Sequence, residues 1–483
     1  MSNGILATFD PQFFTQRMKK ILLASTLLLL NAVCFSQTSS FRAKLEAQTS
    51  LTTPDHLPFW MRSNQFGSIP LSGPSVSVIA SGYKDYDTTK VRLVDWGARF
   101  EGRANGGKGS NLILVEGYGK VKLGIFELKG GRMRETFGLT DTLLTTGNFA
   151  ISGNALGIPK VQIAIPEFYA VPVFGRIFAF KGVFAQGWLG EKTIQNKRID
   201  RAVTYFHQKA FYARIGKPNW RLKLYGGFND QVFWGHEAQI FESFILTGWQ
   251  KYQSVVLGKS WAFSKVGNHA GNIDVRVEYD FDKFKLGLYR QSFYEVGALY
   301  HLANVADGIN GVSLVNKTAK AGDLYWKRFV FEFLYSKNQA GETWSKPTPS
   351  GNENYLNHYL YQDGWSYYGL SLGTPFITPA NHARPGQSSI PINYFINNRI
   401  IALHLGSDFI FGKWNAIGKV SYSKNFGTHD TSKTYKPVNQ FSGYFDFQRN
   451  VGANLTAGGI LAFDSGKLLP NSGGILVKIA RSF

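Results

Sequence analysis

The chain has 483 residues, a formal net charge of +21 and a single cysteine, and 15% of its residues are aromatic. No stretch reaches the about 20 consecutive apolar residues that a membrane-spanning helix needs, which excludes a helical membrane protein. The many aromatic residues and the 52 glycines favour a β-barrel, which needs aromatic girdles at the membrane interfaces and small residues where its wall bends.

An export signal precedes the folded part of the chain. Met18 and two lysines stand before the apolar run 21–30, and small residues then lead to a cleavage site. We expect translation to begin at Met18 and residues 1–36 to be removed as a signal peptide. Cys34 is removed with them, because its neighbours match a lipidation motif poorly. The mature chain, 37–483, therefore has no disulfide.

Alternating apolar and polar residues recur from about residue 75 onwards, as in strands whose two faces meet different surroundings. With about 25 residues for each strand and its connection, this pattern predicts an antiparallel transmembrane β-barrel of roughly 16–18 strands. The clearest strands and hairpins are 111–124, 220–228, 273–290, 329–335 and 410–423.

Three segments interrupt this alternation. Apolar residues of 236–257 recur at helical spacing, which predicts an inserted amphipathic helix that caps or plugs the barrel. Two runs rich in proline, glycine and asparagine, 346–354 and 374–387, predict long loops that face outward. No repeat or domain boundary is evident, so we expect residues 37–483 to form one barrel domain.

The last ten residues have the pattern of a closing barrel strand. Ile475, Val477, Ile479 and Phe483 share one face. Pairing of the last strand with the first removes both open edges of the sheet. We expect the barrel assembly machinery to engage this strand, which ends at Phe483. The alternative is the last strand of a soluble sandwich.

The positive charge predicts anionic surroundings for an exported chain. Outer-membrane lipid and lipopolysaccharide provide such surroundings, and so does an acidic polysaccharide. Export argues against nucleic acid, the usual partner of basic chains. In the alternative interpretation, lysine and arginine line the lumen and the headgroup rims without a dedicated ligand.

The sequence contains no catalytic motif. Its nine histidines are scattered singly, with no HExxH or CxxC metal motif, no GxSxG elbow and no phosphate or dinucleotide fingerprint. His207, His236 and His269 lie near polar segments, but a catalytic triad is recognised only by its geometry. We therefore expect no enzyme, no catalytic residue, no metal and no cofactor.

Several polar-aromatic segments carry a family resemblance, and they are 57–70, 131–139, 152–160, 207–218, 224–235 and 398–406. Together they resemble the capsule-assembly proteins of the Wzi family, in the form found in Bacteroidetes-type bacteria. The resemblance implies an all-β outer-membrane barrel of about 18 strands with short inserted helices on its periplasmic side. It also implies a lectin that retains capsular polysaccharide at the cell surface and is neither an enzyme nor the export channel.

A polysaccharide site needs aromatic faces for sugar rings, and arginine for bidentate pairing with the carboxylates of an acidic polymer. The predicted binding residues of these kinds are Trp60, Arg62, Arg132, Arg134, Lys209, Arg214, Trp234, Trp365, Tyr367 and Arg384. A structural role is the alternative, because Arg and Glu commonly pair across a lumen and Trp commonly sits in a girdle. The outer loops, which also carry Tyr368 and His382, are the better place for a surface glycan to dock.

Three functions remain open. The first is a monomeric surface-attachment protein that holds capsular or extracellular polysaccharide by many weak contacts. The second is an anion-selective porin or transporter with a Lys/Arg-lined lumen, and the third is a scaffold for a secretion or lipid-handling complex. Planar-bilayer conductance separates the first two, because an occluded barrel is silent.

Overall fold

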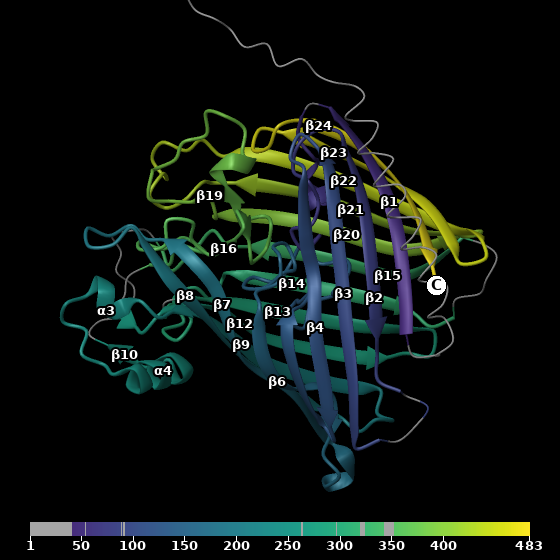
Figure 1. The fold of residues 1–483 in the computed structure, drawn as a ribbon, viewed down its shortest axis with the longest axis horizontal. Helices are drawn as coiled ribbons and strands as arrows, with labels where there is room; N and C mark the ends of the chain where they lie inside the picture. The colour runs from purple at the N-terminus through teal and green to yellow at the C-terminus, as the bar shows by residue number, and fades with distance from the viewer. Residues whose placement is uncertain are drawn as a thin grey trace, which may run out of the picture.

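The computed structural model describes residues 41–483 except 54, 88, 90–91, 262–263, 296, 319–323 and 342–351. The predicted signal peptide lies outside the described residues. The described chain forms a closed barrel of 18 antiparallel strands, in which β1 pairs with β24 to complete the ring (Figure 1). This confirms the predicted all-β barrel.

The strands of the barrel are β1 (Phe41–Thr53), β2 (Ser75–Lys84), β3 (Val94–Gly107), β4 (Asn111–Leu123), β5 (Phe126–Arg132), β6 (Lys160–Ala170), β7 (Phe178–Thr193), β8 (Arg201–Ile215), β9 (Leu222–Trp234), β12 (Asn268–Asp280), β13 (Phe284–Tyr294), β14 (Gly308–Asn316), β15 (Tyr325–Tyr335), β20 (Ile400–Phe411), β21 (Trp414–Asn425), β22 (Val438–Gly452), β23 (Leu455–Gly466) and β24 (Ser472–Ser482). The connections contain the short strands β10 (Ser260–Trp261), β11 (Ser264–Lys265), β16 (Ser366–Tyr367), β17 (Leu370–Ser371), β18 (Thr378–Pro379) and β19 (Phe395–Asn397). They also contain the helices α2 (Phe59–Arg62), η1 (Phe174–Arg176), α3 (Glu237–Ile240), α4 (Gly248–Leu257) and η2 (Ala380–His382).

The outer face of the barrel is apolar, as the alternation predicts. In β24, the side chains of Ile475 and Val477 are 52% and 61% exposed, whereas Leu476 between them is 2% exposed. Exposed apolar side chains recur in the same way along the other strands, for example at Leu403 and Leu405 of β20. A continuous apolar belt of this kind is stable only in lipid, so the barrel spans a membrane.

The two ends of the barrel differ in the length of their connections. The end that carries both Phe41 and Ser482 has short turns, such as 124–125, 412–413 and 453–454. The opposite end carries the long connections 133–159, 235–267 and 336–399. Because outer-membrane barrels have short periplasmic turns and long outer loops, the first end faces the periplasm. We call the second end the outer end.

The helices α3 and α4 correct one expectation. The family resemblance implied inserted helices on the periplasmic side, but both helices belong to the connection between β9 and β12, which leaves the barrel at the outer end (Figure 1). They occupy the interval 236–257 as two separate helices rather than one. Within the described residues, no helix is long and apolar enough to cross a bilayer.

Three connections fold back into the lumen, and we call them the plug: residues 55–74, 133–159 and 352–399. Their aromatic side chains pack on inward-facing residues of the wall. Phe149 stacks on Phe293 of β13 with ring centroids 4.4 Å apart, and Trp365 stacks on Phe233 of β9 at 4.0 Å. The main hydrophobic core therefore lies inside the barrel, between the plug and the wall.

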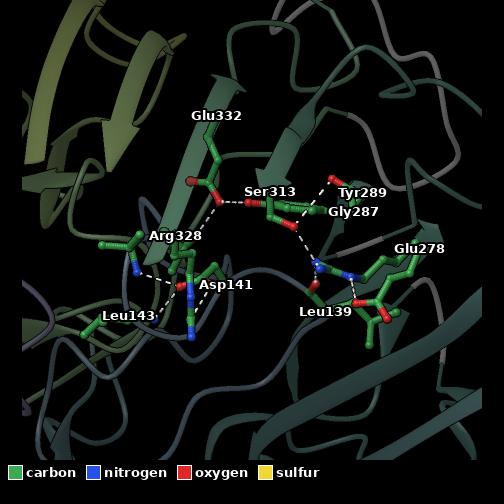
Figure 2. Close-up of polar contacts among 12 residues, drawn as sticks. Leu139, Asp141, Leu143, Glu278, Gly287, Tyr289, Ser313, Arg328 and Glu332 are labelled. Atoms are coloured by element: carbon green, nitrogen blue, oxygen red, sulfur yellow. Dashed lines mark hydrogen bonds and ion pairs between the residues drawn. The ribbon is translucent and has the colours of Figure 1, made fainter. Parts of the chain in front are cut away.

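Polar contacts fix the plug to the wall as well (Figure 2). Asp141 accepts a 2.7 Å hydrogen bond from the Arg328 guanidinium of β15, and the carbonyl of Leu139 accepts one of 3.0 Å from Arg276 of β12. Buried polar groups must be paired in this way, since an unpaired donor or acceptor costs about 1–3 kcal/mol. The inward-facing polar residues of these strands are thus anchors for the plug.

Candidate functional site

A pocket of about 320 Å³ lies at the outer end, and we call it the outer pocket. It is bounded by the β1–β2 connection, the β23–β24 connection and the short helix η2. Its charged and histidine lining consists of Asp55, His56, Arg62, Lys108, His382 and Asp464. Of these, only Arg62 belongs to the ten residues predicted to bind polysaccharide.

The helix α2 positions Arg62 in this pocket. The backbone N–H of Phe59 donates a 2.7 Å hydrogen bond to a carboxylate of β23, and the indole N–H of Trp60 donates one of 3.0 Å to Ser421 of β21. These two bonds hold the helix against the inner wall. Arg62, its last residue, then donates from Nη1 to Nδ1 of His382 at 2.9 Å.

His382 is held in its neutral form. Burial, together with the positive charge of Arg62 and the neighbouring His56, lowers the pKa of His382 to about 2. Its Nδ1 can therefore act as the acceptor for the Arg62 guanidinium. This contact directs the planar group of Arg62, which offers several N–H donors in a fixed geometry.

Lys108 brings a second cation to the outer pocket. It lies in the turn between β3 and β4 and forms an ion pair with Asp55. The pocket thus combines two cations with the carboxylates of Asp55 and Asp464. Guanidinium and ammonium donors can bind sugar carboxylates or hydroxyls, while aspartate oxygens can accept from hydroxyls.

A second group of predicted residues meets at the outer rim, and we call it the aromatic platform: Arg132, Tyr367 and Tyr368. Arg132 donates to the Tyr367 hydroxyl at 3.4 Å, and its guanidinium lies 5.8 Å from the centres of both tyrosine rings. Tyr368 is 72% exposed. An exposed aromatic face beside an arginine is a suitable surface for a sugar ring.

Several other predicted residues lie inside the protein. Trp60 and Trp365 are fully buried in the core of the plug. Arg134 pairs with Glu101 in the lumen, and the Arg214 guanidinium lies 5.8 Å from the ring centre of Phe168. These positions give the residues structural contacts and place them away from the outer pocket.

The remaining three predicted residues lie elsewhere. Lys209 and Trp234 are on the outside of the barrel wall, beside the α4 segment. Arg384 donates to the carbonyl of Gly466 at 2.9 Å and to the side chain of Asn471 at 3.0 Å. It therefore holds the β23–β24 connection that forms one side of the outer pocket.

Sequence reasoning missed several residues of the outer pocket. Asp55 and His56 directly precede the segment 57–70 that carries the family resemblance, and Lys108 is a single cation in a glycine-rich turn. Both features were visible, but only the fold brings them together. Across the described residues, no cluster of three or more His, Cys, Asp or Glu side chains could hold a metal ion.

Comparison with known proteins places the chain in a family. The family model of the capsule assembly protein Wzi matches residues 69–405. No curated protein sequence matches the chain.

Among solved structures, OccAB2 of Acinetobacter baumannii is 11% identical with a TM-score of 0.46, and OccK5 of Pseudomonas aeruginosa is 10% identical with a TM-score of 0.44. Both alignments cover 92% of this chain and 98% of the other chain. These structures are distant, and the match of the family model over most of the chain confirms the predicted resemblance. The chain is an outer-membrane β-barrel that belongs to the family of the capsule assembly protein Wzi.

Proposed function

We propose that this capsule-assembly barrel retains capsular polysaccharide at the cell surface by non-catalytic binding at its outer end. The observation that carries the proposal is the outer pocket, in which Arg62 and Lys108 lie beside carboxylates and a neutral histidine. Such a mixture suits an acidic, hydroxyl-rich polymer. Tyr368, the exposed tyrosine of the aromatic platform, adds a second contact surface at the same end of the barrel.

Weak individual contacts are sufficient for such a function. A polymer with many repeat units can engage the outer pocket and the aromatic platform at once, and it can engage many copies of the protein along its length. Each additional contact acts at a high effective concentration, so the overall affinity exceeds that of any single site. Tight binding of one sugar unit is not required.

The plug argues against the alternative, an anion-selective porin. A porin needs a water-filled lumen lined by available cations. Here the plug packs on the inner wall, and luminal cations such as Lys44 and Lys478 pair with Glu46 and Asp446 at 2.6 and 2.7 Å. We therefore regard transport as the weaker proposal.

The proposal is tested by removing the two cations of the outer pocket. In a capsulated host, Arg62→Gln with Lys108→Gln should lower cell-bound polysaccharide several-fold and raise the polysaccharide shed into the medium by the same amount. Total synthesis should stay unchanged, because the protein acts after export. The measurement is the polysaccharide content of washed cells and of culture supernatant.

A matched control removes two exposed cations from the periplasmic end. Arg221→Gln with Lys317→Gln loses the same charge, and Arg221 pairs with Asp282 in a turn between strands. This variant should retain polysaccharide like the unaltered protein. The proposal would be contradicted if the outer-pocket variant retained as much polysaccharide as the unaltered protein. Unchanged cell-bound polysaccharide in a deletion strain would also contradict it.

The remaining partners are also proposals. A closed ring of 18 strands has no free sheet edge, which supports a monomer. The C-terminal strand pairs with β1 up to the last residues, which supports engagement of that strand by the barrel assembly machinery when the ring closes.

A further inference from the structure

A polar cluster lies on the outside of the barrel wall, on the face that elsewhere meets lipid. Lys209 of β8 lies two positions before the exposed Phe211, and Asp230 of β9 lies two positions after the exposed Phe228. Because side chains two positions apart share a face of a strand, Lys209 and Asp230 point away from the lumen. His269 of β12 lies beside them.

Lys209 and His269 both contact the carboxylate of Asp230. The Lys209 ammonium lies 3.0 Å from Asp230, and Nδ1 of His269 lies 3.1 Å from the same carboxylate. Nε2 of His269 donates to the carbonyl of Val266 at 3.1 Å. Asp230 and His269 are each only 3% exposed. Charged groups facing hydrocarbon would be costly, so something must cover them.

The cover comes from the described residues of the connection, 235–261 and 264–267, which leave the barrel and fold back against its outer wall. Within it, α4 begins with a capping box, in which Thr247 and Gln250 bond each other's backbone N–H groups, and it ends at Gly258 with φ +62°. Val255 of α4 packs with Val232 of the outer wall and with Phe244 and Val266. Figure 1 shows α4 beside the barrel, next to β8 and β9.

The other side of this segment carries three uncovered apolar side chains, with the polar Gln253 between two of them on the same face of α4. Ile245, Trp249 and Leu257 are 82%, 67% and 63% exposed. An isolated exposed apolar residue needs no explanation, but three such large side chains on one short segment do.

A chain of aromatic rings joins this apolar side to the barrel wall. Trp249 lies 6.0 Å from Tyr252, Tyr252 lies 5.6 Å from Trp234, and Trp234 lies 5.4 Å from Tyr205. Aromatic residues of this kind form the girdles of outer-membrane barrels at the membrane interface. The uncovered side of α4 is therefore continuous with the lipid-facing surface of the barrel.

We propose that the segment 235–267 is an interfacial anchor, whose residues Ile245, Trp249 and Leu257 insert among the lipid chains of the outer leaflet. Helix α4 carries no acidic residue, its Lys251 pairs with Glu237 at 3.6 Å, and the exposed Lys259 follows the helix with its own positive charge. This charge suits the phosphate-bearing outer leaflet, as in other amphipathic helices that lie in a membrane interface. The anchor also shields the polar cluster from hydrocarbon.

Site-directed spin labelling tests the anchor directly. In a Cys34→Ser background the chain has no other cysteine, so a single nitroxide can be placed at Trp249→Cys or Leu257→Cys. The full barrel is reconstituted in vesicles of lipopolysaccharide and phosphatidylethanolamine. Power-saturation electron paramagnetic resonance then compares the accessibility of each label to oxygen and to a water-soluble nickel chelate.

We expect labels at 249 and 257 to show an oxygen-to-nickel accessibility ratio several-fold higher than a label at Asp282, an 80% exposed side chain in the turn between β12 and β13 at the periplasmic end. The ratio should approach that of Val477→Cys in the lipid belt. Ratios equal to that of Asp282→Cys at both sites would overturn the proposal. Spin–spin broadening between labels at 257 would also overturn it, because it would show a second copy of the chain as the occupant.

Discussion

At the residue scale, Glu332 is the most heavily bonded contact between wall and plug. Its carboxylate accepts hydrogen bonds of 2.6 and 2.7 Å from the backbone and hydroxyl of Thr146, one of 2.7 Å from Thr145 and one of 2.6 Å from Tyr289. The backbone N–H of Thr146 can only donate, whereas the three hydroxyls can donate or accept. All four bonds are charge-assisted with the carboxylate and become neutral with an amide.

Glu332→Gln should therefore destabilise the protein. The hydroxyls that face the new NH₂ group must turn from donors into acceptors and the remaining bonds lose their charge-assisted strength, at a cost of about 1–3 kcal/mol. Thermal unfolding of the detergent-folded barrel should show a lower melting temperature and faster protease cleavage within 133–159. Glu191→Gln is the control, since Glu191 pairs with Arg201 at 3.7 Å on the surface and such pairs contribute about 0–1 kcal/mol. Equal melting temperatures for the two variants would contradict this account.

His382 predicts a pH dependence. Its ordinary pKa is about 6.5, and burial beside Arg62 lowers the folded-state pKa to about 2. Below pH 6.5 the unfolded chain therefore binds a proton that the folded chain excludes. The stability contributed by the neutral imidazole is fully present above pH 6.5 and is lost progressively as the pH falls toward 2.

The measurement is the melting temperature at pH 7.5 and at pH 4.5. His382→Asn removes the titrating group and should show a smaller drop between the two pH values than the unaltered protein. His301→Asn, at an exposed histidine, should drop as much as the unaltered protein. The same drop in all three proteins would show that His382 does not contribute.

Side-chain type alone could not separate binding residues from core residues. Trp60 and Trp365 have the chemistry of a sugar platform, yet both are buried, because the connections that carry them fold into the lumen. Arg62 and Tyr368 come from the same connections and reach the outer end, whereas Tyr367 is 7% exposed and packs in the same core as Trp365. The sequence predicts which segments matter, whereas the direction of each side chain depends on contacts with distant strands, such as that of Trp60 with Ser421.

At the element scale, the strands were predictable because each has one face in lipid. The expected hairpins 273–290 and 410–423 correspond to β12–β13 and β20–β21, and the expected closing strand is β24. The plug was not predictable, since its segments show neither strand nor helix periodicity. The conformation of these segments depends on contacts with the surrounding strands. Because those strands lie elsewhere in the sequence, the local sequence of a plug segment does not predict its conformation.

The lipid belt at β24 yields a prediction for this strand. Val477 faces outward near the middle of β24, so Val477→Arg would place a charge among lipid chains. The expected cost is about 2–4 kcal/mol near the middle of the membrane, measured by reversible unfolding from lipid vesicles. Lys478→Arg is the control at the adjacent position, because its side chain faces the lumen and can keep the ion pair with Asp446. A cost below 1 kcal/mol for Val477→Arg would place this residue outside the membrane.

At the scale of the whole molecule, the barrel has two apolar regions with different roles, one on its outer surface and one in its interior. The lipid belt holds the barrel in the membrane, and the apolar core between plug and wall holds the plug in the lumen. This arrangement leaves the outer pocket and the aromatic platform on a rigid support, since their residues are carried by connections packed against the strands. A rigid, closed barrel suits the retention of a polymer better than the passage of solutes.

The closed lumen gives the last prediction. In planar bilayers the unaltered protein should show no steady conductance at neutral pH, because the plug packs on the inner wall of the barrel. Replacing residues 139–150 by a short Gly/Ser linker removes the anchors at Leu139 and Asp141, and single-channel steps should then appear. The 18 strands should still close, since their ladder does not include the plug, and heat-modifiable migration of the folded barrel on gels checks this. Steady, anion-selective current through the unaltered protein would instead favour the transporter and count against polysaccharide retention as its main function.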